Sequence, residues 1–239
     1  MIRSLLFAIA FYGITTVMAA LYLPLMVLPR AVFRKMCLAW VRIMVGLIQT
    51  ALGIRYELRG LENCPEGAAI YAAKHQSAWD VLIFNLLIDD CAYVLKRELY
   101  RIPFWGWFVW RVGSVGIDRS GGARALRGMV EQAKSLLVHG RSIIVFPQGT
   151  RTPVGEHRPY LPGTAALYLG SDVPVVPVAL NSGVFWPRRT FRKSPGTITV
   201  EFLPPIAPGL NRREFLKQLE AQVETATTRL EQEALERSR

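Results

Sequence analysis

The N-terminal part of the chain contains a run from Ser4 to Leu28 without a single charged side chain. An apolar helix of about 20 residues is long enough to cross the hydrocarbon core of a bilayer. A cleaved signal peptide would have a shorter apolar part followed by a small-residue cleavage site, and this run fits neither feature cleanly. We therefore interpret it as a retained membrane anchor. Pro24 lies near its end and is expected to kink the helix, so a tilted or partly embedded helix fits as well as a straight span.

A second apolar run, Met36 to Ile54, contains only one charge, Arg42, and follows a basic break formed by Arg30, Arg34 and Lys35. Two complete spans would place these three cations across the membrane from the rest of the chain. The positive-inside tendency disfavours that arrangement if the rest of the chain is cytoplasmic. Two arrangements fit better: one span followed by an interfacial helix, or two helices that lie in one leaflet.

The chain carries a net charge of +11 although 51% of its residues are hydrophobic. Such a charge indicates an anionic partner, either nucleic acid or a membrane surface. The apolar composition favours the membrane, and the sequence contains no recognisable nucleic-acid-reading module. The cysteines Cys37, Cys64 and Cys91 are odd in number and lack metal-ligand spacing, so we expect free thiols in a reducing compartment.

From Arg55 onward, short apolar runs alternate with helical patterns, which predicts an α/β fold. The predicted strands are Arg55–Leu58, Ala68–Ala73, Ala92–Leu95, Val112–Ile117, Ser142–Phe146, Val173–Leu180 and Thr197–Phe202. The predicted helices are Ala78–Leu87, Phe104–Arg111, Gly122–His139, Gly163–Leu169 and Arg212–Arg237. We expect a mixed, mostly parallel sheet flanked by helices, in a domain of residues 55–239 that follows an anchoring segment of residues 1–54.

A histidine and an aspartate, His75 and Asp80, lie where a buried strand is expected to turn into a helix. With His75 ahead of the helix and Asp80 in its first turn, the two side chains can meet. A carboxylate on one imidazole nitrogen fixes the tautomer and leaves the other nitrogen free to accept a proton, which makes a general base. A structural interpretation competes, because Ser77 followed by Asp80 fits a helix-capping pattern, and these residues alone favour it.

Two loops carry an arginine just past a predicted strand. The first is Gly113–Arg119, and the second is Phe146–Arg151 with the sequence Phe-Pro-Gln-Gly-Thr-Arg. Backbone N–H groups in a glycine-containing turn and a guanidinium can together bind a phosphate. Each loop alone is better explained by a solvated arginine, and Asp118 could pair locally with Arg119. No Gly-Lys-Ser/Thr sequence occurs, so nucleotide hydrolysis is not indicated.

Two predicted elements carry structural expectations only. Pro174 and Pro177 interrupt the apolar run Val173–Leu180, and we expect that strand at a sheet edge or with a bulge, because an interior strand rarely tolerates proline. The last helix begins after Asn211 as its cap and has an apolar stripe at helical spacing. We interpret its charged face as solvated and assign it no chemistry.

Taken in order, four stretches resemble the blocks of the lysophospholipid acyltransferase family, the group that contains the 1-acyl-sn-glycerol-3-phosphate acyltransferases. The His-x4-Asp block matches His75 and Asp80, and the Gly-x-x-x-Ile-Asp-Arg block matches Gly113–Arg119. The Phe-Pro-Glu-Gly-Thr-Arg block matches Phe146–Arg151, and the Val-Pro-Val block matches Val176–Val178. The resemblance covers about Ile54 to Leu180, and bacterial members also have N-terminal hydrophobic helices.

The resemblance implies transfer of a fatty acyl group from a thioester of acyl carrier protein or coenzyme A to the 2-hydroxyl of 1-acyl-sn-glycerol 3-phosphate. The product would be phosphatidic acid, made at the cytoplasmic face of the inner membrane during phospholipid biosynthesis. His75 would be the base and Asp80 its orienting partner. The implied phosphate ligands are Arg119, Gly149, Thr150, Arg151 and Lys96. A thioester is already activated, so no covalent nucleophile, metal or cofactor is implied. His75, His139 and His157 show no metal-ligand spacing.

Three departures from the family pattern leave the acceptor open. Gln148 replaces a glutamate, Gly116 replaces a larger residue, and Leu161-Pro162-Gly163 lacks the usual lysine. The alternatives are the same chemistry on a lyso-ornithine lipid or glycerol 3-phosphate, or a non-catalytic lipid-binding protein with this fold. The aromatic stretch Ile102–Trp110 is expected to line an acyl tunnel, to lie at the membrane interface, or to pack beside the sheet.

Overall fold

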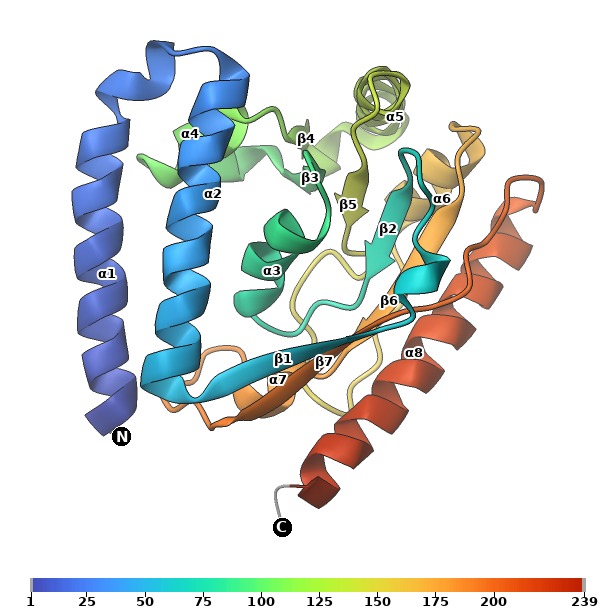
Figure 1. Ribbon diagram of the computed structural model, residues 1–239. Coiled ribbons are helices and arrows are strands. Elements are labelled where there is room, and N and C mark those ends of the chain that lie inside the picture. The colour runs from blue at the N-terminus through green and yellow to red at the C-terminus, as the bar shows by residue number, and fades with distance from the viewer. Residues whose placement is uncertain (1, 238–239) are drawn as a thin grey trace.

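The computed structural model describes residues 2–237 and contains a seven-stranded sheet with helices on both faces (Figure 1). The strand order is β1-β7-β6-β2-β5-β3-β4. The strands are β1 (Ile54–Arg59), β2 (Ile70–Ala73), β3 (Ala92–Lys96), β4 (Val115–Ile117), β5 (Ile143–Val145), β6 (Val175–Leu180) and β7 (Gly196–Phe202). Among the paired strands of residues 2–237, only β6 and β7 run antiparallel. The predicted mixed, mostly parallel α/β fold is confirmed.

The helices predicted downstream of the anchor are all found, and each end lies within one residue of its expected position. The helices are α1 (Ile2–Tyr22), α2 (Arg30–Leu47), α3 (Trp79–Leu87), α4 (Trp105–Arg111), α5 (Gly122–Val138), α6 (Pro162–Leu169), α7 (Ser182–Phe185) and α8 (Arg212–Arg237). The one-turn helix α7 was not predicted, because four residues are too few to show a helical pattern.

The sheet divides the core into two layers, and the period of two along each strand sets which side chain enters which layer. In β2, Tyr71 and Ala73 belong to the apolar cluster that includes residues of α1, α2 and α3, whereas Ile70 and Ala72 belong to the cluster with α5, α6 and α8. Figure 1 shows the same division, with α1, α2 and α3 on one side of the sheet and α5, α6 and α8 on the other. Every residue of β2 is buried, as expected for a central strand covered on both faces.

The strand with two prolines is not an edge strand, so that part of the prediction is wrong. β6 lies between β2 and β7, and Pro177 pairs with Ala72 of β2. The bulge that was the other alternative lies on the partner side: Val178 pairs with Phe202, whereas Val175 is bridged to Ile206, so the register shifts by one residue between them. Pro177 needs no N–H donor there, and its carbonyl accepts from the backbone N–H of Leu203 at 2.9 Å. A proline is therefore tolerated inside the sheet because the ladder is interrupted beside it.

The two N-terminal apolar runs form an antiparallel helix pair, α1 and α2, joined by a 3-10 turn at Pro24–Val27 (Figure 1). Instead of kinking the first helix, Pro24 follows its end and opens the turn. The pair lies against the domain over much of its length. Near its start, Ser4 Oγ accepts from the backbone N–H of Lys193 at 3.3 Å. At the turn, Arg111 Nε donates to the carbonyl of Met26 at 2.8 Å.

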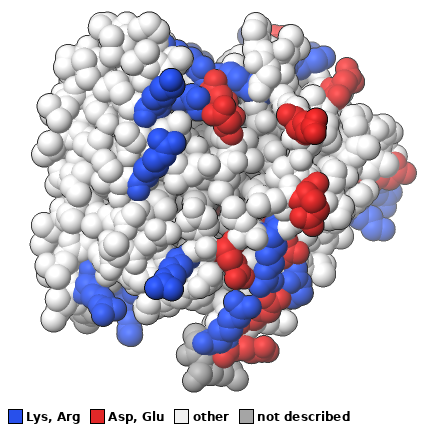
Figure 2. Space-filling model, viewed as in Figure 1, with Lys and Arg blue, Asp and Glu red and all other residues white. Residues whose placement is uncertain are grey.

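The outer surface of α1 is apolar to an extent that is unusual for a surface in water. Six of its large side chains are at least 59% exposed, and these are Ile2, Leu6, Ile9, Tyr12, Val17 and Leu21. In Figure 2 the part of the surface over α1 and α2 is mostly white, whereas charged side chains gather over α8. By length and composition α1 is the described helix that could cross a membrane. A contiguous apolar surface of this kind marks a site of membrane or protein contact, and the helix is consistent with membrane association.

The basic break at the start of α2 attaches this helix to the sheet. Arg30 forms a bidentate ion pair with Asp90, just before β3, and Arg141 Nε lies 3.2 Å from the same carboxylate. Arg34 pairs with Asp89 at 3.0 Å. Burial acts against the charge of Asp90, but hydrogen bonds from Arg30 and the charges of Arg141, Arg30 and Arg34 hold its pKa below the usual 3.8. Arg30 and Arg34 therefore form structural contacts, whereas Lys35 is exposed.

We predict that Asp90→Asn lowers the free energy of unfolding by about 1–3 kcal/mol, because the arginines lose a shared, partly buried carboxylate. Asparagine keeps the local backbone, since position 90 has a φ of 40° and asparagine tolerates that conformation. The group's folded pKa is depressed, so its contribution is complete above about pH 5 and is lost as the pH falls through the folded value. Thermal unfolding in detergent against pH measures this difference, with the exposed Asp172→Asn as control. An equal loss at pH 7 and at pH 3 would contradict the assignment.

Candidate active site

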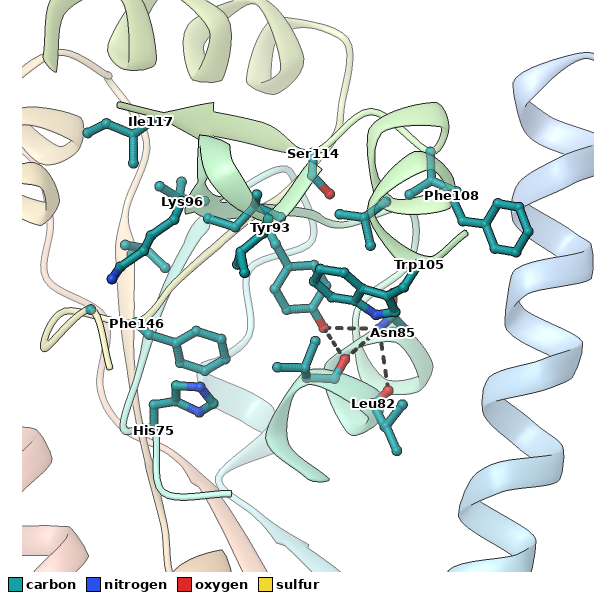
Figure 3. A pocket seen from close by; sticks show the side chains of 18 of the residues that line it. His75, Leu82, Asn85, Tyr93, Lys96, Trp105, Phe108, Ser114, Ile117 and Phe146 are labelled. Atoms are coloured by element: carbon teal, nitrogen blue, oxygen red, sulfur yellow. Dashed lines mark hydrogen bonds between the residues drawn. The ribbon is translucent and has the colours of Figure 1, made fainter. Parts of the chain in front are cut away.

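The residues predicted for catalysis and phosphate binding meet at one edge of the sheet. His75 follows β2, Lys96 ends β3, Arg119 follows β4, and Gly149–Arg151 follow β5. Because these four strands are parallel, their carboxyl ends lie at the same edge, where ligands bind in open α/β sheets. All of these residues line one cavity of about 1030 Å³. Figure 3 shows His75, Lys96 and Phe146 around it. Asp80 lies behind His75 and is fully buried.

The His75–Asp80 pair has the geometry expected of an oriented base. Asp80 Oδ2 lies 2.9 Å from His75 Nδ1. The same oxygen accepts from the backbone N–H groups of Gln76 at 2.8 Å and Ser77 at 2.9 Å. Asp80 therefore serves the turn and the imidazole together, so the structural and the functional interpretations of this stretch do not compete. Ser77 contributes separately, because its Oγ accepts from the N–H of Trp79 at 3.2 Å.

The contacts of Asp80 also assign the imidazole tautomer. An ionised carboxylate only accepts hydrogen bonds, so Nδ1 carries the proton and Nε2 has a free lone pair. The ring stacks on Phe146, with centroids 4.0 Å apart and planes 19° from parallel. Phe146 directly follows β5 and is the first residue of the block Phe146–Arg151. Its contact with His75 therefore joins this block to the His-x4-Asp block. Asp80 therefore fixes the Nδ1 edge of the ring, and Phe146 covers one of its faces.

Arg119 is held on the loop that follows β5. Its Nη2 donates to the carbonyl of Gly149 at 3.0 Å. Asp118 instead accepts from the N–H and the hydroxyl of Ser120, so the expected local pair between Asp118 and Arg119 does not form. Gly149 has a φ of +63°, and a Cβ there would lie 2.5 Å from Arg119 Nη2. The glycine is needed both for the left-handed backbone and for the close approach of the guanidinium.

The structure adds an arginine that the sequence did not single out. Arg188, in the loop after α7, lines the same cavity, and its Nη1 donates to the carbonyl of Arg151 at 3.3 Å. Its Nε is buried without a hydrogen-bond partner. Burial and the charge of Arg188 lower the pKa of Arg151. Two guanidinium groups that lie close together at a cavity wall are suited to binding an anion. No motif marks Arg188, and only its position after the Val-Pro-Val strand could have suggested it.

The rest of the cavity is mostly apolar. It extends from His75 past Val81 and Leu82 of α3 and under Trp105 and Phe108 of α4 (Figure 3). It ends against α1 and α2, where its walls are Thr15, Thr16, Met18, Ala19, Ala20, Tyr22, Cys37, Trp40 and Val41. Part of the aromatic stretch, including Trp105 and Phe108, therefore lines the cavity, and its role as the wall of an acyl tunnel stays a prediction. A cavity with a cationic end, a base and a long apolar arm suits an amphiphile with an anionic head.

The expectation that the charged face of α8 is solvated is wrong for two residues. Glu224 and Glu231 are buried, with 7% and 6% of their surface exposed. Each is an acceptor for several groups of the loops around His75. The available signal was their position: each directly follows a residue of the apolar stripe, Val223 or Leu230.

The other titratable groups give no second site. Among residues 2–237, no group of three or more His, Cys, Asp or Glu side chains could hold a metal ion. The three cysteines are free, and burial raises the pKa of Cys91 to about 12. That thiol is therefore protonated and unreactive near neutral pH.

Comparison with known proteins identifies similar chains. A family model described as "Acyltransferase" matches residues 55–181. A 1-acyl-sn-glycerol-3-phosphate acyltransferase of Pseudomonas aeruginosa is 39% identical over 175 residues, which are 73% of this chain and 68% of that protein. The enzyme of the same name from Limnanthes alba is 34% identical and matches over 67% of this chain. The chain spans 58% of the length of that plant relative.

The fold is also similar to a solved structure along almost its whole length. The crystal structure of the 1-acyl-sn-glycerophosphate (LPA) acyltransferase, PlsC, from Thermotoga maritima superimposes with a TM-score of 0.77 at 27% identity. The superposition covers 96% of each chain, so it includes the N-terminal helix pair and α8.

We predict that Gly149→Ala weakens the binding of a phosphate monoester about tenfold. The new methyl group forces Arg119 away from the loop, and the backbone loses its left-handed conformation. Titration of purified protein with a soluble phosphate monoester, followed by NMR, measures the change. Gly128→Ala in α5, where a Cβ meets nothing within 4 Å, is the matched control. Unchanged affinity in Gly149→Ala would remove Arg119 and this loop from the anion site.

Proposed function

This chain belongs to the acyltransferase family, and on that premise we infer that it acylates lysophosphatidic acid to phosphatidic acid in phospholipid biosynthesis. The acyl group comes from a thioester and is transferred to the 2-hydroxyl of 1-acyl-sn-glycerol 3-phosphate. The observation that carries this function is the cavity itself. One space contains the free Nε2 edge of His75, the arginine cluster and a long apolar arm.

We propose that His75 is the general base and Asp80 its orienting partner. Nε2 takes the proton of the acceptor hydroxyl while that oxygen attacks the thioester carbonyl. The new carbon–oxygen bond forms, the carbon–sulfur bond breaks, and the thiolate takes the proton from the imidazolium. The Asp80 carboxylate stabilises the imidazolium between these steps. A general base of this kind contributes about 10²–10⁴-fold to the rate.

We propose that the acceptor phosphate is bound by Arg119, Arg151 and Arg188, with the backbone of Gly149 and Thr150 and the side chain of Lys96. The support is that all six line the cavity and that Arg188 has a buried, unpartnered Nε. One guanidinium group can donate to two phosphate oxygens at once, so the neighbouring Arg151 and Arg188 can bind one phosphate together. The apolar arm is the proposed position of an acyl chain. The donor is acyl carrier protein or coenzyme A, whose thioester enters from the polar end.

We propose that residues 1–54 anchor the protein in the inner membrane and that residues 55–239 form the acyltransferase domain, with the site facing the cytoplasm. The contacts of α1 favour two helices in one leaflet over a full span. α1 meets the domain near its start, through Ser4 with Lys193, and the turn that follows α1 meets it through Met26 with Arg111. A helix that crossed the bilayer would leave the domain at one end. The cavity reaches α1 and α2, so a lipid can enter the site from the leaflet that holds these helices.

We predict that His75→Ala lowers kcat about 10²–10⁴-fold, because the imidazole is the base. The protein should still fold, since the N–H groups of Gln76 and Ser77 continue to donate to Asp80 and close the turn. Asp80→Asn should lower kcat by about 10²-fold or more, since the tautomer is no longer fixed. Phosphatidate formation by purified protein measures both rates, and circular dichroism checks the fold. His139→Ala is the control, because His139 lies exposed at the end of α5. Near wild-type turnover in His75→Ala would mean that another group is the base.

The function itself is tested by lipid analysis of cells that lack their own lysophosphatidate acyltransferase, with and without this chain. Growth with phosphatidate restored is the expected result. A new acylated aminolipid without rescue would instead identify lyso-ornithine lipid as the acceptor. Acylated glycerol 3-phosphate without rescue would identify that alternative. No change in any lipid would contradict the proposed activity.

A further inference from the structure

Two carboxylates of α8 hold the residues on either side of His75. Glu224 Oε2 lies 2.6 Å from Nζ of Lys74, and Glu231 Oε1 lies 2.5 Å from Nε2 of Gln76. The two glutamates are seven residues apart, which is about two helical turns, so both face the same side of α8. The residue before the base and the residue after it are thus fixed by one rigid helix. α8 lies outside residues 55–181, to which the family model is matched.

The Lys74–Glu224 pair is buried, with 1% of Lys74 and 7% of Glu224 exposed. A buried charge is stable only when it is paired and hydrogen-bonded. Three further groups lie within hydrogen-bond distance of this carboxylate. Gln148 Nε2 lies 3.0 Å and the Tyr160 hydroxyl 2.9 Å from Oε1, and His157 Nδ1 lies 2.9 Å from Oε2.

The same helix also fixes the loop that carries the anion site. Glu231 Oε2 accepts from the backbone N–H of Gly155 at 3.1 Å. The N–H of Thr152 donates to the carbonyl of His75 at 2.8 Å, which joins this loop directly to the base. Gln148 lies one residue before Gly149, so the Glu224 contact acts immediately beside the phosphate loop. The base and the phosphate ligands therefore share one support.

The contact with Glu224 explains why a neutral side chain suits position 148. Its amide donates to a carboxylate that already neutralises Lys74. A glutamate at 148 would place a second carboxylate against Glu224, with one lysine to balance both. The pocket therefore contains one carboxylate for Lys74, which lies on α8 at position 224, and a neutral amide at position 148.

We propose that Glu224 and Glu231 are positioning residues of the acyl transfer: they set His75 and the Gly149–Arg151 loop relative to one another, and Glu224 supplies the single carboxylate that Lys74 and Gln148 require. This inference rests on the proposed function, because the effect is defined on the transfer rate. Neither glutamate lines the cavity, so each acts through the residues it holds.

The test is a charge swap between positions 148 and 224. Glu224→Gln leaves Lys74 without a carboxylate, and Gln148→Glu places two carboxylates together. Each single variant should lower kcat about 10–100-fold with less than a threefold change in acceptor KM, because displacement of the base by a fraction of an ångström affects the chemical step. The double variant Gln148→Glu/Glu224→Gln restores one carboxylate and should recover at least tenfold in kcat over the weaker single variant. A double variant no more active than the single variants would overturn the shared-carboxylate proposal.

A second variant keeps the proposal testable if Glu224→Gln does not fold. In Glu231→Gln, an NH₂ group replaces one of the two carboxylate oxygens. This group cannot accept a hydrogen bond, so the contact with either Gln76 or Gly155 is lost. This variant should lower kcat severalfold, and amide hydrogen exchange of residues 74–80 should become faster. Glu236→Gln, on an exposed part of the same helix, is the matched control and should change neither. Wild-type kcat and exchange in Glu231→Gln would overturn its role.

The proposed acyl transfer and the positioning role of Glu224 and Glu231 can be tested independently. Absence of transfer by the wild-type protein would contradict the proposed function. Hydrogen exchange at residues 74–80 needs no activity, so it tests the positioning role of α8 even in that case.

Discussion

One oxygen of a buried aspartate sets the geometry on which the rest of the site depends. Asp80 Oδ2 accepts from two backbone N–H groups and from the imidazole of His75. The first two contacts close the turn between β2 and α3, and the third fixes the tautomer of the base. Because the turn and the base share this acceptor, the backbone cannot relax without moving the imidazole. The stacked ring of Phe146 and the glutamates of α8 then join this turn to the loop that follows β5.

The sheet brings separated motifs together, and the N-terminal helices add the apolar environment. Parallel strands place the base, the arginine loops and Lys96 at one edge, although these residues lie up to 76 positions apart in the sequence. The same cavity continues to α1 and α2, whose outer surface is apolar. We propose that one cavity therefore binds all parts of a single-chain lipid: the arginines bind its anionic head, His75 contacts its hydroxyl, and the apolar arm contains its chain. The activated thioester supplies the remaining chemical requirement.

Much of this arrangement could be predicted from the sequence, because it depends on local patterns. Strands and helices follow from periodicity, and the pairing of His75 with Asp80 follows from a five-residue spacing across a turn. The position of β6 was partly mispredicted, because the break in the ladder that accommodates Pro177 lies on a different strand segment, at Leu203–Ile206. Arg188, Glu224 and Glu231 were not assigned a role, because their partners are far away in the sequence and only tertiary packing brings them to the site. A charged residue next to an apolar stripe is expected to be solvated, because the sequence of the helix does not show which distant loop covers it.

The central claim is that the acyl group passes directly to the acceptor hydroxyl, with His75 as a base and no covalent intermediate. Intact-mass spectrometry of the purified protein after incubation with an acyl thioester, in the absence of acceptor, distinguishes direct transfer from a route through an acyl-enzyme. We expect the unmodified mass at all times, followed by product formation when the lysophospholipid is added. A stoichiometric acyl adduct that disappears on addition of the acceptor would contradict it.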